Sequence, residues 1–219
     1  MSDSTRKYGG SSMKRKLLNL LYGGIAAALP ITAAAVTPVS IQLVDPLDDS
    51  RGWCVDLFAH LTGALPLGGL QGHNCFLYMG RGPTEDQGFD AELIEERGEI
   101  RIIHFDMCMT LHDPNPGSFV PIEECNDGEA QDFDMTADGR IVPLMSPELC
   151  LTLGANSVPG GGRLAPVGRE AQNNDNIPQI RRLTFETCSE DDDSIAVRQR
   201  WQLEDTYEER TPTREKRFQ

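Results

Sequence analysis

Six cysteines and three Gln-x-aromatic motifs recur in the same order three times along this 219-residue chain. Each copy opens with a cysteine between apolar residues, continues to a second cysteine and closes with Gln-x-aromatic. The opening motifs are Trp53-Cys54-Val55-Asp56-Leu57, Met107-Cys108-Met109-Thr110-Leu111 and Leu149-Cys150-Leu151-Thr152-Leu153; the second cysteines are Cys75, Cys125 and Cys188; the closing motifs are Gln87-Gly88-Phe89, Gln131-Asp132-Phe133 and Gln199-Arg200-Trp201. Gln87 and Gln131 are 44 residues apart, and Cys108 and Cys150 are 42 apart. A period of this length is typical of a repeat architecture.

The repeated unit has the pattern of β-structure. Around Cys108, apolar residues alternate with other residues from Phe105 to Leu111, which is the period of a half-buried strand. Arg97-Gly98 and Asp138-Gly139 are hairpin-turn signals, so each closing strand is expected to turn back into the strand leading to the next cysteine. Beyond residue 35 no stretch shows a long helical period.

Three short units of this kind need one another to form a core. A hairpin of about forty residues cannot bury its own apolar face, whereas three copies around one axis can share a core. We expect each closing aromatic to enter that core. We also expect the Gln two residues earlier to bind main-chain groups with both ends of its amide.

The first 35 residues have the pattern of a secretory signal. A basic start is followed by an apolar run from Leu17 and by Ala33-Ala34-Ala35, after which we place the cleavage. An uncleaved anchor is the alternative, but Gly23, Gly24 and Pro30 interrupt the run and it is short for a membrane span. We therefore expect a secreted or periplasmic protein with no stable membrane insertion after cleavage.

The net charge excludes several classes of binding partner. Without residues 1–35 the chain keeps 33 acidic and 15 basic residues, a net charge of −18. Nucleic acids, anionic membranes and sulfated glycans attract basic surfaces, so these partners are disfavoured.

An even number of cysteines in an exported chain favours three disulfides over a zinc site, since no Cys-x-x-Cys pair is present.

The repeats resemble the ricin B-type lectin domain, an all-β fold called the β-trefoil. The resemblance covers roughly residues 40–205, with Phe in place of Trp in two closing motifs. It implies a domain over 36–205, followed by a charged tail, 206–219, that we expect to be disordered. It also implies one disulfide inside each repeat, namely Cys54–Cys75, Cys108–Cys125 and Cys150–Cys188. The third cysteine spacing is long, 38 positions against 21 and 17, and the excess from Gly154 to Arg182 is expected to be a loop rather than a strand pair.

Sugar binding in this family uses residues outside the Gln-x-aromatic motif. The resemblance implies an Asp two residues after the first cysteine, a Gln four before the second, an aromatic two before it, and an Asn or Asp before the closing Gln. The first repeat fills these positions with Asp56, Gln71, His73 and Asp86, beside Gln87, so these five residues are the expected carbohydrate site. The other repeats look degenerate, with Thr110, Pro121 and Glu123 in the second and Thr152, Thr184 and Glu186 in the third.

The sequence contains no motif for metal binding or for nucleophilic catalysis. The four histidines show no metal-ligand spacing, the acidic runs lack a complete calcium loop, and no nucleophile motif is present. We expect no cofactor, no metal and no catalytic residue. The predicted function is binding of a neutral carbohydrate, such as a galactose-type or other hexose. The alternative is a non-catalytic scaffold that binds a partner protein after losing its sugar sites.

Overall fold

The computed structural model describes residues 36–79, 82–160, 177–190 and 194–205. The chain separates into two units, residues 1–34 and 35–219, and every described residue belongs to the second. The expected signal at 1–35 and tail at 206–219 lie outside the described residues. Within the described ranges, no helix has the length and apolarity needed to cross a membrane.

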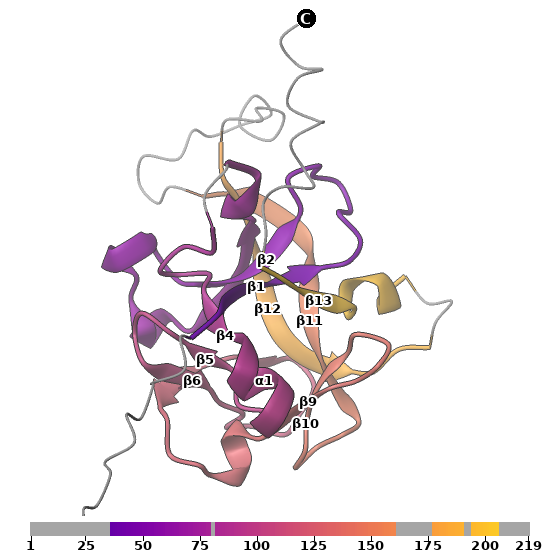
Figure 1. Ribbon diagram of the computed structural model, residues 1–219. Helices are drawn as coiled ribbons and strands as arrows, with labels where there is room; N and C mark the ends of the chain where they lie inside the picture. Colours follow the sequence, from indigo (N-terminus) through magenta and orange to yellow (C-terminus); the bar gives the residue numbers. More distant parts are fainter. Residues whose placement is uncertain (1–35, 80–81, 161–176, 191–193, 206–219) are drawn as a thin grey trace, which may run out of the picture. The chain divides into compact units, whose positions relative to one another are not determined.

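The described chain is built mostly from β-strands, four of which belong to each repeat (Figure 1). The first repeat contains β1 (Pro38–Leu43), β2 (Trp53–Leu57), β3 (Leu70–Asn74) and β4 (Phe89–Asp90); the second contains β5 (Arg101–Ile102), β6 (Met107–Met109), β8 (Ile122–Glu124) and β9 (Phe133–Met135), with the short β7 (Ser118–Phe119) between β6 and β8; the third contains β10 (Ile141–Pro143), β11 (Leu149–Pro159), β12 (Gln179–Thr187) and β13 (Trp201–Glu204).

The first and last strands of the repeats form a closed ring. Antiparallel ladders join β1 to β4, β4 to β5, β9 to β10, and β13 back to β1. At the two remaining junctions, Phe133 N donates to Gly98 O at 3.0 Å beside an antiparallel bridge between Glu99 and Asp132, and Trp201 N donates to Gly139 O at 2.7 Å. The middle strands form three hairpins, β2–β3, β6–β8 and β11–β12. This ring with three hairpins is a β-trefoil, and the fold predicted from the sequence is confirmed.

Each hairpin carries its own disulfide. Cys54–Cys75, Cys108–Cys125 and Cys150–Cys188 all form, and the described residues include no free cysteine. The expected pairing is therefore confirmed, with every bridge inside one repeat.

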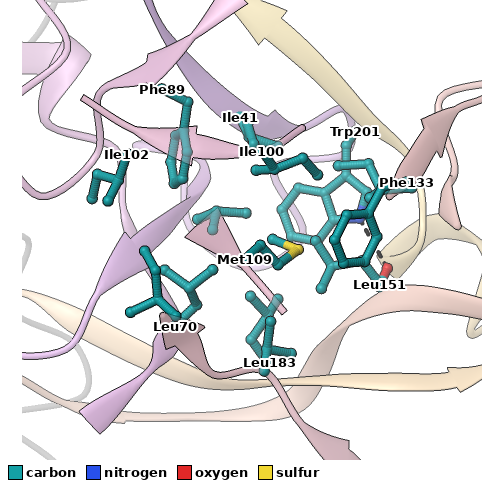
Figure 2. Packing of buried hydrophobic residues seen from close by; sticks show 14 of the residues in the cluster. Ile41, Leu70, Phe89, Ile100, Ile102, Met109, Phe133, Leu151, Leu183 and Trp201 are labelled. Carbon is teal, nitrogen blue, oxygen red and sulfur yellow. Dashed lines mark hydrogen bonds between the residues drawn. The ribbon is translucent and has the colours of Figure 1, made fainter. Parts of the chain in front are cut away.

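The core lies inside the ring and under the hairpins. The three closing aromatics, Phe89, Phe133 and Trp201, are all buried there, as predicted. Figure 2 shows Phe133 and Trp201 beside Met109 and Leu151, with the Trp201 indole donating to Leu151 O at 2.9 Å. Aliphatic side chains from all three repeats complete the cluster, which one repeat alone could not enclose.

The turn predicted at Arg97-Gly98 is wrong, whereas the one at Asp138-Gly139 is confirmed. Residues 91–97 form a helix, α1 (Ala91–Arg97), capped by Asp90, whose carboxylate accepts from Leu93 N. Gly98 ends α1 in the left-handed conformation, φ 69°, and a Cβ there would lie 2.0 Å from Phe133 O. β4 still returns to β5, so the helix is an insertion into the expected hairpin (Figure 1).

The expectation that residues 154–182 form a loop without strands is also wrong at both ends. β11 continues to Pro159 and β12 begins at Gln179, with a bulge between Leu153 and Ser157. The extension is stabilised from outside its own repeat, because β12 also pairs with β3 of the first repeat. Gly72 of β3 leaves room for Leu153 of β11, since a Cβ there would lie 2.1 Å from a Leu153 methyl carbon. Residues 161–176 lie outside the described residues.

Candidate functional site

The three closing glutamines make the same hydrogen bonds in all three repeats. Each Oε1 accepts from the backbone N–H of the residue after the second cysteine, and each Nε2 donates to the carbonyl of the residue before it. The acceptor bonds come from Phe76, Asn126 and Ser189 at 3.0, 2.8 and 2.8 Å, and the donor bonds go to Asn74, Glu124 and Thr187 at 3.1, 3.1 and 3.0 Å. Both ends of each amide are thus used, as predicted, and the motif holds the second half-cystine of each repeat.

A third bond of each glutamine amide, the second from its Nε2, reaches the residue two positions after the first cysteine. Gln131 donates to the Thr110 hydroxyl at 3.0 Å, and Gln199 donates to the Thr152 hydroxyl at 2.9 Å. In the first repeat the acceptor is instead Asp56 Oδ2, 3.0 Å from the Gln87 amide. The fold therefore needs one oxygen acceptor here, and a threonine supplies it twice.

Asp56 offers a second oxygen, and the first repeat uses it. Gln71 lies directly opposite Asp56 in the β2–β3 ladder and donates to Asp56 Oδ1 at 2.8 Å. The corresponding cross-strand partners of Thr110 and Thr152 are Pro121 and Thr184, which have no amide. The Asp56–Gln71 pair is therefore specific to the first repeat.

His73 and Asp86 lie at the same hairpin. The His73 ring packs on Phe76, with ring centroids 5.0 Å apart, and its Nδ1 lies 2.8 Å from Asn74 O. A carbonyl can only accept, so Nδ1 carries the proton; burial lowers the pKa of His73, which favours the neutral ring at pH 7, with Nε2 as an acceptor. Asp86 accepts from Thr84 Oγ1 at 2.7 Å and from Leu61 N.

The five expected site residues are thus near one hairpin, but most of them are covered. Asp56, Asp86 and Gln87 have no exposed surface, His73 is 7 % exposed, and Gln71 is partly exposed. The loop between β2 and β3 contributes to this cover through Leu61. Neither carboxylate is therefore open to a ligand in this conformation.

Burial also changes the acidity of Asp56. Desolvation and the nearby charge of Asp86 raise the pKa of Asp56 well above 3.8, despite the opposing hydrogen bonds from Gln71 and Gln87. Among the described residues no cation pairs with either carboxylate. Holding Asp56 ionised in this position costs stability.

We predict that this cost appears as a pH dependence of stability. A carboxyl whose pKa is higher in the folded state binds its proton more tightly there, so unfolding free energy falls as pH rises from about 4 to the raised pKa. The slope within that window is up to about 1.4 kcal/mol per pH unit. Urea unfolding between pH 5 and pH 8 should show the decline in the wild type and a smaller one in Asp56→Thr. Equal slopes in the two proteins would contradict this assignment.

The third repeat has an open hollow at the corresponding hairpin, which sequence analysis did not predict. It measures about 420 Å³, and its lining includes Thr152, Thr184 and Glu186, the three positions judged degenerate. Arg182 and Arg198 also line it. Arg198 precedes the closing Gln, as Asp86 does in the first repeat.

The described residues contain one compact group of metal-ligand types, Glu99, Cys108 and Cys125. Both cysteines are joined in a disulfide, so their sulfurs are not thiolates and the group offers one ordinary ligand.

Comparisons with known proteins find similarity in structure and none in sequence. No protein-family profile and no curated protein matches the chain. Similar solved structures include the agglutinin of Abrus precatorius (TM-score 0.46, 19 % identity, 79 % of this chain), the β-trefoil lectin of the Vibrio vulnificus hemolysin/cytolysin with N-acetyl-D-lactosamine bound (0.43, 17 %, 79 %) and the Haemophilus ducreyi cytolethal distending toxin (0.45, 14 %, 78 %). The matches span 50 %, 97 % and 84 % of those three chains, so this chain covers half of the agglutinin chain.

Proposed function

We propose that the protein is a non-catalytic carbohydrate-binding protein that takes a neutral hexose, or a glycoconjugate carrying one, at the first repeat. The observation that carries the proposal is the Asp56–Gln71 pair. Thr110 and Thr152 fulfil the structural role of position 56 with one hydroxyl, so the second carboxylate oxygen exceeds what the fold needs. Side chains that lower the stability of the protein and make no contact that the fold needs are typical of functional sites.

The chemistry of the cluster suits sugar hydroxyls. A carboxylate accepts hydrogen bonds from two neighbouring hydroxyls, and the Gln71 amide offers both a donor and an acceptor. The neutral His73 ring adds an acceptor at Nε2 and a flat surface, and His73 packs on Phe76. A single site of this kind is expected to bind a monosaccharide with a Kd of about 1 mM, about −4 kcal/mol.

Entry of the sugar requires the loop that precedes β3 to move. Ala59 and Leu61 have positive φ angles, 97° and 47°, which are unfavourable for residues with a side chain. Backbone strain of this kind is common at ligand-binding loops. Releasing Leu61 N would free one oxygen of Asp86, next to the Asp56–Gln71 pair, for a sugar hydroxyl.

Substitution of Gln71 tests the proposal. Gln71→Thr introduces the residue that the third repeat has at this position, Thr184, so the fold should tolerate it. We expect hexose affinity, measured by calorimetric titration of a monosaccharide panel, to fall by tenfold or more, about 1.4 kcal/mol. The matched control is Glu123→Ala, at the second-repeat position that corresponds to His73, which should leave affinity unchanged. Equal hexose affinities of the wild type and Gln71→Thr would contradict a sugar site in the first repeat.

A second candidate function, docking of a partner protein, is favoured by an apolar surface beside the site. Phe58, Leu65, Leu67 and Phe119 are all exposed, and Leu67 is fully so. Phe58 and Phe119 lie over the adjacent glycines Gly68 and Gly69. Docking would be supported by two results together. The wild type would bind no glycan, and the substitutions Leu67→Ser and Phe119→Ser would abolish its binding to a purified partner protein.

We also propose that the protein is exported, to a periplasm or to the medium. The three disulfides of the trefoil support this, because such bonds persist in oxidising compartments. N-terminal sequencing of the exported protein should then begin at Val36, and an intact start at Met1 would contradict cleavage.

A further inference from the structure

We infer that the hollow of the third repeat is a second saccharide site, one that selects a carboxylated sugar. The inference rests on the proposed carbohydrate-binding function, but on different residues. Its volume, about 420 Å³, lies within the range of small-molecule sites, about 300–1,000 Å³. It is a hollow in the surface, whereas the equivalent first-repeat position is covered.

The charges around the hollow are the first argument. The described residues contain eight arginines and no lysine. Six of the arginines, Arg51, Arg97, Arg101, Arg140, Arg181 and Arg200, pair with carboxylates. The other two are Arg182 and Arg198, and both line the hollow. Within the described ranges, the two guanidinium groups without an acidic partner thus line the same hollow.

The anchoring of these arginines is the second argument. Arg198 Nη1 donates to Leu153 O at 2.9 Å, and Arg182 Nη2 donates to Gly117 O at 3.3 Å. Backbone carbonyls orient a guanidinium without neutralising its charge. Each side chain therefore keeps further N–H donors for an anion, and a planar carboxylate matches the guanidinium geometry.

The remaining lining groups favour a sugar over a simple anion. Thr184 Oγ1 donates to Glu186 Oε1 at 2.8 Å, which leaves Glu186 with a second oxygen that can accept from a hydroxyl. Among the described lining residues, two guanidiniums face one carboxylate. A ligand that complements both features carries one carboxylate and several hydroxyls, as a uronic acid does.

Arg198 is the residue that distinguishes this hollow from its counterparts. At the same place before the closing Gln, the first repeat has Asp86 and the second has Ala130. An aspartate there would repel a carboxylated ligand, whereas Arg198 attracts one. The difference between Asp86 in the first repeat and Arg198 in the third therefore changes which ligand is favoured, and does not merely abolish binding.

Glucuronate, glucose and acetate test the inference, because glucuronate differs from glucose only in the oxidised C6. We expect the purified protein to bind glucuronate about tenfold more tightly than glucose at the third repeat and more tightly than acetate, with affinity falling as salt rises. Arg198→Ala, which introduces the residue of the second repeat, should abolish the preference for glucuronate. Arg97→Ala removes an equally charged but ion-paired arginine elsewhere and should leave it intact.

The two proposals fail separately in this experiment. If Gln71→Thr leaves hexose binding intact while Arg198→Ala removes the glucuronate preference, the first-repeat site falls and the third-repeat site stands. Equal affinity for glucuronate and glucose, unchanged binding by Arg198→Ala, or acetate binding as tightly as glucuronate would overturn the inference. Binding of neutral hexoses alone would leave only the proposed function.

Discussion

Reduction of the three disulfides is expected to unfold the protein at 25 °C without denaturant. The bridges close loops of 21, 17 and 38 positions, and in the chain-entropy model each stabilises the fold by about 3–4 kcal/mol. Their sum, about 10 kcal/mol, is comparable to the whole stability of an ordinary domain. Near-ultraviolet circular dichroism before and after reduction should show loss of tertiary structure.

Removal of single bridges gives a graded version of the same test. Because the entropy term grows with loop length, replacing both cysteines of Cys150–Cys188 by alanine should cost the most, and replacing Cys108–Cys125 the least. Urea unfolding of the three double variants measures this order. A reduced protein that keeps its folded signal and its unfolding midpoint would show that the trefoil core is sufficient without the bridges.

Trp201→Ala is expected to destabilise the protein by about 3–5 kcal/mol. The indole is buried to 99 % at the point where β13 completes the ring, and its removal leaves a cavity and takes the donor from Leu151 O. The milder control is Trp201→Phe, because Phe89 and Phe133 occupy the same place in the other repeats. Urea unfolding should rank wild type, Trp201→Phe and Trp201→Ala in that order. A cost below about 1 kcal/mol for Trp201→Ala would contradict the shared core.

The trefoil could be predicted from the sequence because its determinants recur three times. A single Gln-x-Phe carries little information, but the three glutamines bind equivalent main-chain groups, so their order along the chain reflects one structural role. Helix α1 was missed because seven residues are too few to establish a helical period. Asp90 before it and Gly98 after it were available as cap signals, but Asp90 was not considered and Gly98 was interpreted as part of a turn.

The outer parts of β11 and β12 could not be predicted from local composition. Gly154, Asn156 and Pro159 favour a loop, and the strand forms there because β3, from another repeat, lies along β12. Such a contact joins residues about a hundred positions apart, which no local pattern contains.

The five residues of the candidate site remain a prediction; the structure places them at one hairpin, and their burial was not expected from the sequence. The resemblance named Asp56 and Gln71 from their spacing to the cysteines, and the β2–β3 register places the two side chains opposite each other. The cover over Asp86 depends on how the loop around Leu61 folds back, which is a tertiary property. The hollow of the third repeat was missed for a related reason, since Arg198 is informative only when its lack of an acidic partner is seen.

The carbohydrate affinity of Asp56→Thr tests most directly the claim that the first repeat carries a function beyond its structural role. Threonine restores the bond that Thr110 and Thr152 give to the closing Gln and removes only the second oxygen and the charge. We predict a variant whose unfolding free energy at pH 7 is at least that of the wild type and whose neutral-hexose binding is lost. Wild-type affinity in a folded Asp56→Thr protein would contradict the claim.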